Sequence, residues 1–467
     1  NTDDYSGYHH EIEGGGIFAE GGTINIVNCT IANNERQGIR MTGGDVNVES
    51  SIIWGNGDND GGSINYTYTN RQGSVPGGEG NISKDPWFVD SGNGNYNLKP
   101  GSVCINRGSI NELDSDGTRR DMGVLIYEHT YFGPEWHVSS DGDQLNGDGS
   151  VANPLSSVQA AINLANEGDD IILSEGVYTG DGNRDIYFLG KGVTVRSSGE
   201  TENTILDGQD QNRIMKFETH GSFSAATENT IIEGLTIREG QVEGDEQKGG
   251  GIYIYNASPV FNNCIISDNR IVDTNGGWSR VRGGGVYAYQ SNSVFNNVIF
   301  RSNEAFARTD NTYDDAYAYG GALFVDSGNI QLNKCTFENN SIYGDDRSGN
   351  GNSVAYIKGS GIHKTGGGTL SITGTQFYSN TVTWDGSQHD IKGGGIYTDG
   401  GTINIVNCTI ANNDKHGIYR DGGDVNVDQS TIVYNQSSGL NGGNQYISNS
   451  IIWGNGDNDS GSINYTY

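Results

Sequence analysis

The feature that most constrains the fold of this chain is a pattern repeated five times between residues 248 and 413. Each copy opens with a glycine cluster and closes with an apolar residue, two variable residues and an asparagine. The closing asparagines follow one another at intervals of 34, 37, 40 and 33 residues: Asn269, Asn303, Asn340, Asn380 and Asn413. A fixed pattern separated by loops of variable length is typical of a solenoid.

The residues between these landmarks indicate which solenoid forms. Short runs such as 294–295, 369–372 and 403–406 are rich in β-formers and show no helical period. Glycine, asparagine and aspartate stand at the bends. We therefore predict an all-β chain that folds as a parallel β-helix, with coils stacked about 4.8 Å apart. The asparagines then form a column that is hydrogen-bonded from coil to coil, and two later residues extend it: Asn435 and Asn455.

Composition and charge exclude several classes of protein. The 467 residues include 74 glycines without a collagen period, and 33% are hydrophobic, which suits a solenoid with a thin core. The net charge of −31 argues against a nucleic-acid partner and against an anionic membrane surface. No apolar run reaches 18 residues, so membrane insertion is not expected. Residue 1 is Asn rather than Met, which indicates a processed product or a window on a longer protein.

An internal duplication gives independent evidence for the fold. Residues 21–34 recur identically as 400–413 at an offset of 379, whereas 52–60 match 451–459 at an offset of 399. The second copy therefore contains 20 additional residues, including one more apolar-x-x-Asn unit that ends at Asn435. Insertion of one whole coil is what a β-helix tolerates, because every column stays in register.

The duplication also predicts tandem units. Residues 1–130 are interpreted as the late coils and closing segment of one unit, 131–150 as a junction, and 151–467 as the next unit. The second unit opens with a predicted capping helix, because residues 155, 158, 161, 162 and 165 are apolar and share one helical face. Asn153 is the expected N-cap, with Pro154 at the first helical position.

Several segments resemble known β-helix families. Residues 85–90, 96–102 and 116–123 are similar to the closing segment of secreted bacterial right-handed β-helix repeat proteins. A helix followed by Gly168-Asp169-Asp170-Ile171 and Gly176-Val177-Tyr178 resembles the start of pectate-lyase-like β-helices, in which the helix plugs the first coil. The middle coils resemble the repeats of chlamydial polymorphic membrane proteins. These resemblances imply a right-handed helix and an extracellular or cell-surface location, but no particular activity.

The five cysteines are expected to be buried free thiols. Aligning the coils on the asparagines places Cys264, Cys335 and Cys408 in one column, on coils that are not neighbours. Cysteines two coils apart are about 9.6 Å apart, which is too far for a disulfide.

Two outer columns are the candidate binding residues. The first is basic and precedes the glycine clusters: Lys248, Arg282, Lys358 and Lys392. The second is aromatic and follows them: Tyr253, Tyr287, Phe324 and Tyr397, with His363 in the fourth coil. Alternation along the strand predicts that the rings face outward, where they could stack on sugars or on a partner chain. The alternatives are ion pairs between the cations and neighbours such as Glu246 and Asp390, and ring-on-ring stacking that stabilises the coil.

Calcium is the one cofactor that the sequence allows, through acidic turns that contain Asp58, Asp60, Asp114 and Asp116. The first turn resembles the start of an EF-hand loop but lacks its final glutamate, since Thr67 stands there. Solvated turns without a metal are the alternative.

The repetition favours a structural or adhesive unit of a large extracellular surface protein or fibre, assembled in tandem or end to end with copies of itself. The rival function is a polysaccharide lyase or glycan-binding β-helix that acts on an anionic polysaccharide. No catalytic motif is complete, so the sequence favours a non-enzymatic role. A groove with acids and bases converging in one region would favour the rival, whereas the same exposed residues in every coil would favour the fibre.

Overall fold

The computed structural model describes residues 15–57, 60–219, 229–244, 247–311, 313–347, 353–386, 389–461 and 463–466. Nearly all of its regular structure is parallel β-strand, which confirms an all-β parallel β-helix. The chain divides into two compact units, residues 1–166 with 219–224, and residues 167–218 with 225–467. The tandem organisation stays a prediction.

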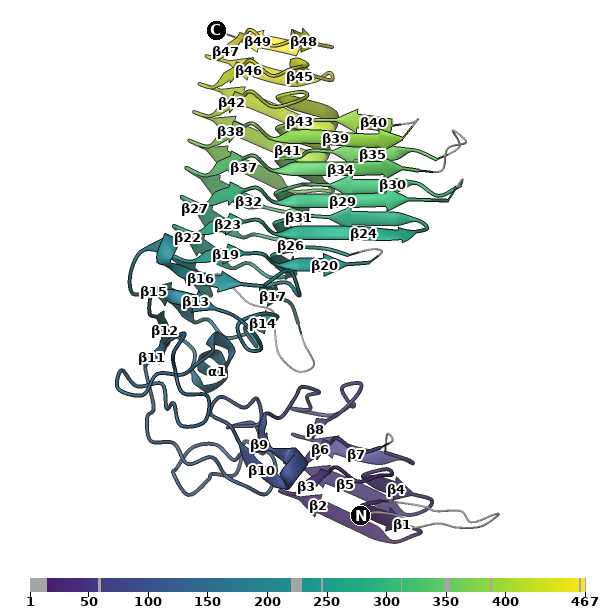
Figure 1. Ribbon diagram of the computed structural model, residues 1–467, viewed down its shortest axis with the longest axis vertical. Helices are drawn as coiled ribbons and strands as arrows, with labels where there is room; N and C mark the ends of the chain where they lie inside the picture. The colour runs from purple at the N-terminus through teal and green to yellow at the C-terminus, as the bar shows by residue number, and fades with distance from the viewer. Residues whose placement is uncertain are drawn as a thin grey trace. The chain divides into compact units, whose positions relative to one another are not determined.

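In the second unit each coil adds strands to three columns that run along the stack (Figure 1). The first column contains β14 (Ile186–Tyr187), β17 (Met215–Phe217), β21 (Ile252–Tyr255), β26 (Val286–Ser291), β31 (Leu323–Gly328), β36 (Ile362–Thr365), β41 (Ile396–Val406), β43 (Ile418–Asp428), β45 (Ser438–Asn441) and β48 (Asp457–Ser460). The second contains β12 (Asp170–Leu173), β15 (Thr194–Ser197), β18 (Ile231–Glu233), β22 (Val260–Asn262), β27 (Val294–Asn296), β32 (Ile330–Asn333), β37 (Thr369–Thr373), the later parts of β41 and β43, β46 (Gln445–Ser448) and β49 (Ile463–Thr466).

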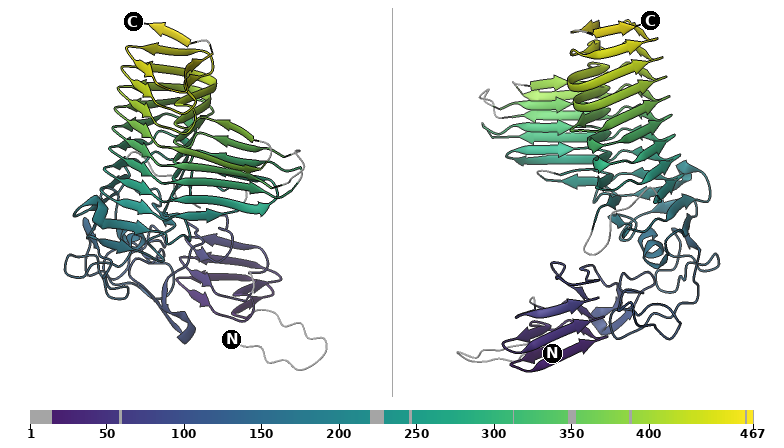
Figure 2. Two further views of the ribbon diagram at one scale, coloured as in Figure 1. Left: turned by 45° about the horizontal axis from the view of Figure 1, so that its top comes forward. Right: turned by 180° about the vertical axis from the view of Figure 1, so that it is seen from behind.

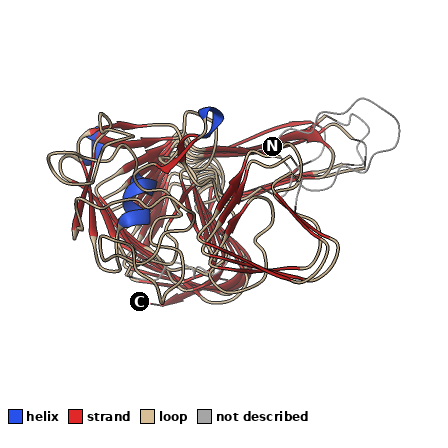
Figure 3. Ribbon diagram, turned by 90° about the horizontal axis from the view of Figure 1, so that it is seen from below, coloured by secondary structure: helices blue, strands red, loops and turns tan. Residues whose placement is uncertain are grey.

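The third column contains β13 (Gly176–Tyr178), β16 (Thr204–Asp207), which follows the 3-10 turn η2 (Thr201–Asn203), β19 (Thr236–Arg238), β23 (Ile265–Ser267), β28 (Ile299–Arg301), β33 (Thr336–Glu338), β38 (Gln376–Tyr378), β42 (Thr409–Ala411), β44 (Thr431–Val433) and β47 (Ile451–Trp453). Figure 3 looks along the stack and shows the strands of successive coils one behind another.

The core is one side chain deep on each wall, and equivalent residues lie directly above one another. Phe300, Phe337 and Phe377 are fully buried and stack at centroid distances of 4.4 and 4.7 Å. The glycine clusters stand where neighbouring backbones approach too closely for a side chain. A Cβ at Gly284 would lie 2.3 Å from the carbonyl oxygens of Glu304 and Gly321, so only glycine fits there.

The expected loops of variable length are wrong for the middle coils, because those segments form strands. Two further parallel sheets project from the side of the stack and are termed the wing (Figure 2). One sheet contains β20 (Gln241–Glu243), β24 (Arg270–Gly276), β29 (Glu304–Thr309), β34 (Ser341–Asp346) and β39 (Thr381–Gly386). The other contains β25 (Ser279–Arg282), β30 (Ala316–Tyr319), β35 (Ala355–Lys358) and β40 (His389–Lys392).

The wing has its own small core, and half of the buried residues in it are alanine. Buried side chains from both sheets form one apolar cluster: Ile271, Val281, Ala305, Ala307, Ala316, Ala318, Ile342, Ala355, Ile357 and Val382. A Cβ at Gly344 would lie 2.7 Å from the Ile357 side chain, so the sheets approach closely at this point. Three strands of the second wing sheet, β25, β35 and β40, end on the basic residues that precede the glycine clusters.

The first unit repeats the three-column design on a smaller scale. Its strands pair as β1 (Ile17–Ala19) with β4 (Ile39–Met41), as β2 (Thr23–Val27) with β5 (Asp45–Glu49) and β7 (Ile64–Thr67), and as β3 (Thr30–Ala32) with β6 (Ile52–Trp54) and β8 (Asn70–Arg71). Residues 69–130, termed the closing segment, contain β8 together with β9 (Phe88–Asp90), the 3-10 turn η1 (Ser91–Asn93) and β10 (Asn95–Leu98). The unit ends with β11 (Glu135–Val138) and the helix α1 (Val158–Leu164).

The helix is present, but the predicted N-cap is wrong. Ser157 caps α1 by accepting a hydrogen bond from the Ala160 amide. Asn153 and Leu155 are engaged elsewhere, because the Leu155 N–H donates to the His137 carbonyl at 2.9 Å and the Asn153 carbonyl accepts from Asp148 and Gly149. Those bonds hold residues 153–155 extended, so the helix begins later. Its capping role stays a prediction.

The two copies of the duplicated sequence pair in the same register before the inserted coil. Ile24 lies beside Val46 in the first unit, as Ile403 lies beside Val425 in the second. The additional residues of the second copy form one complete coil, with β44 between β42 and β47, which confirms the whole-coil insertion.

Candidate functional site

A groove of about 570 Å³ runs along the second unit beside the outer face of the first column. It is lined by side chains from five successive coils: Lys248, Tyr255, Arg282, Tyr287, Tyr289, Tyr319, Phe324, Asp326, His363, Thr365 and Asp399. Two of the predicted basic residues and two of the predicted aromatic residues therefore meet in one place. Asp326, Asp399 and Tyr289 are lining residues that the sequence analysis did not single out.

The aromatic column stacks ring on ring. Tyr253, Tyr287 and Phe324 are spaced 5.5 Å apart with nearly parallel planes, and His363 and Tyr397 continue the series at 4.8 and 4.7 Å. Alternation does put these rings on the opposite face from buried Ile252. The expectation that they are exposed is nevertheless wrong for three of the four named residues, since Tyr287 and Phe324 are 3% exposed and Tyr397 is 0% exposed.

The basic column explains part of this burial, because each cation lies over the ring of the next coil. The Lys248 ammonium is 5.4 Å from the Tyr287 ring, and Arg282 is 6.0 Å from Phe324. Lys358 lies 5.1 Å from Tyr397 in the same way. The two columns therefore form one interlocked layer, stabilised by cation–π attraction. Since the rings face one another, their edges and hydroxyl groups, rather than their faces, are presented to the groove.

Lys392, at the end of the basic column, forms ion pairs. Its ammonium is 3.3 Å from Asp390 and 2.9 Å from Asp421, and the Tyr397 hydroxyl donates to the same Asp421 carboxylate. The predicted pairing with Asp390 is thus present in this coil. Glu246, the other partner considered, lies outside the described residues.

The ionisation of the groove residues follows from their surroundings. Burial raises the pKa of the lining residues Tyr287 and Tyr319, and it raises that of Tyr253, which stacks on Tyr287, to about 12. These phenols therefore stay protonated and can donate hydrogen bonds. Burial alone would raise the pKa of Asp399, but neighbouring His363, Thr365 and Lys358 lower it to about 2. Burial lowers the pKa of His363, whose Nε2 is 3.7 Å from the Asp399 carboxylate. At neutral pH the groove therefore offers cationic and phenolic donors beside carboxylate acceptors.

The asparagine column is a continuous chain of side-chain hydrogen bonds. Each Nδ2 donates to Oδ1 of the next coil at 2.8–3.0 Å, in the order Asn269, Asn303, Asn340, Asn380, Asn413, Asn435 and Asn455. The same Nδ2 also donates to a backbone carbonyl, so these buried amides are satisfied. The column belongs to the scaffold that positions the groove.

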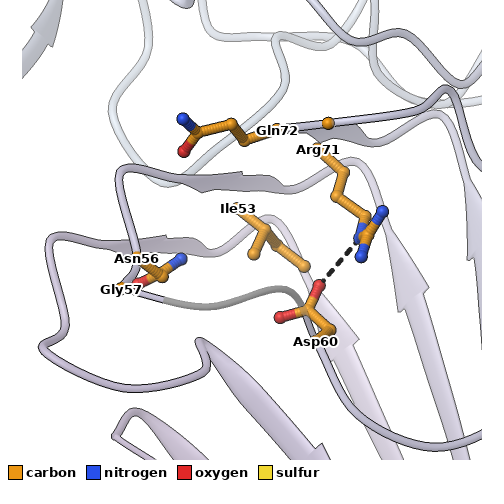
Figure 4. Close-up of a pocket in the computed structure, with 7 residues that line it drawn as sticks. Ile53, Asn56, Gly57, Asp60, Arg71 and Gln72 are labelled. Atoms are coloured by element: carbon orange, nitrogen blue, oxygen red, sulfur yellow. Dashed lines mark hydrogen bonds and ion pairs between the residues drawn. The ribbon is translucent and has the colours of Figure 1, made fainter.

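The acidic turns behave as internal hydrogen-bond acceptors. Asp60 accepts from the Ile39 amide at 3.0 Å and the Tyr66 hydroxyl at 2.9 Å, and it pairs with Arg71 at 3.0 Å. It borders a separate pocket of about 310 Å³ in the first unit (Figure 4). Asp58, predicted beside it, lies outside the described residues.

The other two predicted calcium ligands, both in the closing segment, are engaged in the same manner. Asp114 accepts from Arg120 at 2.9 Å and from the Asp121 amide at 2.8 Å. Asp116 accepts from the Thr118 amide and hydroxyl and from the His129 amide. Among the described residues no three His, Cys, Asp or Glu side chains converge as a metal site would require. The donor set therefore favours a structural role for these turns.

The cysteines lack disulfide partners, as expected from their spacing. Cys104, Cys264, Cys335 and Cys408 are buried, and Cys29 is half-buried. Burial raises the pKa of the Cys104, Cys264 and Cys335 thiols to about 12, so they behave as small apolar residues.

Two comparisons with known proteins find no match: no family model fits the chain, and no curated protein matches its sequence. Among solved structures it is similar to the crystal structure of pectate lyase Pel9A, at 15% identity and a TM-score of 0.35, over 71% of this chain and 76% of the other. It is also similar to a rhamnogalacturonan lyase, at 11% identity and a TM-score of 0.35, over 71% of this chain and 87% of the other. No described helix has the length and apolarity that crossing a membrane requires.

Proposed function

We propose that this protein is an extracellular, adhesive β-helix that binds a polysaccharide in the groove between the wing and the first column. The observation behind the proposal is the mixed lining of the groove, in which phenol hydroxyls, Lys248 and Arg282 lie beside Asp326 and Asp399. Sugars are recognised by such sets of donors and acceptors placed in a concave site, and the volume lies in the usual range for ligand sites.

The content of the groove differs from coil to coil. At one register position the residues are Tyr255, Tyr289, Asp326 and Thr365 in successive strands. A purely repetitive lateral contact would place like residues at each level. The concentration of acids and bases in a few coils therefore supports ligand binding. Lys248 and Arg282 at the same level as the two tyrosines favour a polymer with carboxylate groups, such as a uronate.

Calorimetric titration of the full chain with polygalacturonate and with uncharged dextran tests the proposal. We expect saturable binding to the uronate polymer, weakened by salt because part of the attraction is between charges. Absorbance of unsaturated products in the same samples, with and without calcium, separates binding from lyase activity. Failure of the chain to bind any polysaccharide in such a panel would contradict the proposal.

A matched pair of tyrosines makes the test specific. Tyr255→Ala removes a lining residue, whereas Tyr446→Ala removes a tyrosine that is 52% exposed on β46, away from the groove. We expect the first change to weaken binding at least about tenfold, equivalent to about 1.4 kcal/mol, and the second to leave it unchanged. Equal effects would show that the groove is not the site.

A fibre assembled from copies of the chain is the second candidate function. It is supported by the matching register of the duplicated strands before the inserted coil in the two units. Electron microscopy of the native protein tests it: rods with a regular axial repeat are expected from a fibre, and discrete particles at all concentrations would argue against it.

A further inference from the structure

One stretch of sequence occurs in two different environments in this molecule. Residues 52–60 are identical to 451–459, and the next strand of each copy contains an Ile-Asn-Tyr-Thr sequence. Ile52 is 1% exposed and Tyr66 8%, whereas their counterparts Ile451 and Tyr465 are 61% and 54% exposed. Because the sequences are the same, the difference lies in what covers them.

In the first unit the closing segment covers the strand edge. Strand β8 pairs with β6, and the amides of Asn70 and Gln72 donate to the carbonyls of Ser51 and Ile53 at 2.9 and 3.0 Å. The Gln72 side chain accepts from the Gly55 amide at 2.7 Å. The last coil thus gains a further strand, and its backbone groups are satisfied.

The closing segment also covers the outer face of β6. The Gly123 amide donates to the Ser50 carbonyl at 2.8 Å, and a Cβ at Gly123 would lie 2.8 Å from the Ile52 side chain. The Ser109 amide reaches the Ser50 hydroxyl at 2.8 Å. Glycine is required at position 123 because the backbone rests directly on Ile52, in a conformation with φ of 96°.

In the second unit the corresponding surface is bare within the described residues. β47 and β49 are the last strands of their columns. Large apolar side chains on and beside them are exposed: Tyr434, Tyr446, Ile451, Trp453 and Tyr465. An open strand edge next to an apolar patch is a surface that proteins normally cover.

A carboxylate at this surface indicates which chemistry a docked segment would bring. In the first unit Asp60 accepts from Tyr66 and pairs with Arg71 of the closing segment. In the second unit Asp459 accepts from Tyr465 in the same way, but it is exposed and has no cationic partner among the residues the structure describes. The carboxylate and phenol are in place, and the guanidinium is supplied by the segment that docks.

We propose that the last two coils of the second unit, residues 431–466, form a docking surface for a polypeptide segment with the chemistry of residues 69–130. The segment adds a strand to β47 as β8 adds to β6, pairs an arginine with Asp459 and rests a glycine on Ile451. The inference is independent of the polysaccharide groove, which lies in earlier coils.

The test is a full chain that carries a second copy of residues 69–130 after Tyr467. Because Tyr467 corresponds to Tyr68, this junction recreates the Tyr68–Thr69 link. Hydrogen exchange of peptides from 431–466 is compared with that of the unextended chain at low and high concentration. We expect exchange in the extended chain to slow at least tenfold. Unchanged exchange overturns the proposal, as does protection of the unextended chain that rises with concentration, which would assign the surface to a second copy.

Two variants test whether protection in the extended chain comes from docking of the appended segment on residues 431–466. Ile451→Lys is expected to leave the exchange of the unextended chain unchanged, since the side chain is exposed there, and to abolish the protection in the extended chain. In the appended copy, the change equivalent to Gly123→Leu is expected to abolish protection as well, because leucine cannot fit against Ile451. Protection that survives both changes overturns the proposal.

Discussion

At the scale of single residues, the asparagine column is stable because the side chain of each inner member forms several hydrogen bonds. Asn340 alone takes part in four side-chain bonds, to Asn303, Asn380 and the Phe300 carbonyl. The sequence predicted this column because one residue type recurs at one position. The sequence could not predict the burial of the aromatic column, because the cation that covers each ring comes from a neighbouring coil. Which cation lies over which ring is known only once the coils are stacked in register.

Replacing Asn340 with leucine should open the middle of the second unit. The change leaves two buried donors of Asn303 without an acceptor, at about 1–3 kcal/mol for each unsatisfied group. We expect exchange of amides in 300–306 and 337–343 to rise roughly a hundredfold by mass spectrometry. Asn455→Leu, at the half-buried end of the column, is the control. Equal effects at both positions would contradict a cooperative column.

Asp121 should make the closing segment sensitive to pH. Asp121 is 1% exposed, and burial raises the pKa of its carboxyl from 3.8 to about 7, although two backbone amides donate to it. Since the folded state holds this proton more tightly than the unfolded state, the stabilisation is full below about pH 4 and is lost as the pH rises through 7.

We therefore expect exchange protection of residues 101–130, corrected for intrinsic rates, to fall between pH 5 and pH 8. Asp121→Asn should remove most of this dependence. A pH dependence that is identical in the variant would assign it to another group.

At the scale of elements, the three columns were predictable and the wing was not. Alternating apolar runs and bend residues indicate the coil strands directly. Small and large residues alternate along the wing strands too, as in Ala316-Tyr317-Ala318-Tyr319. The inward residues are small, however, so the composition of these segments resembles that of a loop. Alanine fills this core because the two sheets lie close together. The sheets form only when successive coils each contribute a pair of wing strands, and a single coil does not reveal this. The helix begins late for a similar reason, since Leu155 pairs with β11 and Asn153 accepts hydrogen bonds from Asp148 and Gly149.

Overpacking the wing should loosen it without disturbing the coils. Ala316 is fully buried between the two sheets, and Ala316→Leu is expected to destabilise this region by about 1–3 kcal/mol. Exchange should rise in 304–309 and 316–319 and stay unchanged in 330–337. Tyr317→Leu, which changes the adjacent half-buried residue on the other face, should have a smaller effect. Unfolding of the coil strands together with the wing would show that the two form one cooperative unit.

At the scale of the whole molecule, the thiols report separately on the two units. Cys29 is half-buried in the first unit, while Cys264, Cys335 and Cys408 lie inside the coils of the second. We expect a thiol reagent to label Cys29 in the native protein and to label the other three roughly a hundredfold more slowly, because their reaction requires coil opening. Rapid native labelling of Cys335 would contradict the tight packing of the middle coils.

The unequal spacing of the asparagines has a mechanical consequence. The interval between bonded members of the column is 40 residues from Asn340 to Asn380 but 20 from Asn435 to Asn455. Under tension applied at the C-terminal end, coils that peel away singly would release contour lengths of about 140 Å and about 70 Å for these two intervals. The stack therefore releases its coils in unequal steps. The longest rupture in a single-molecule trace would mark the opening of the interval from Asn340 to Asn380, and the shortest that from Asn435 to Asn455.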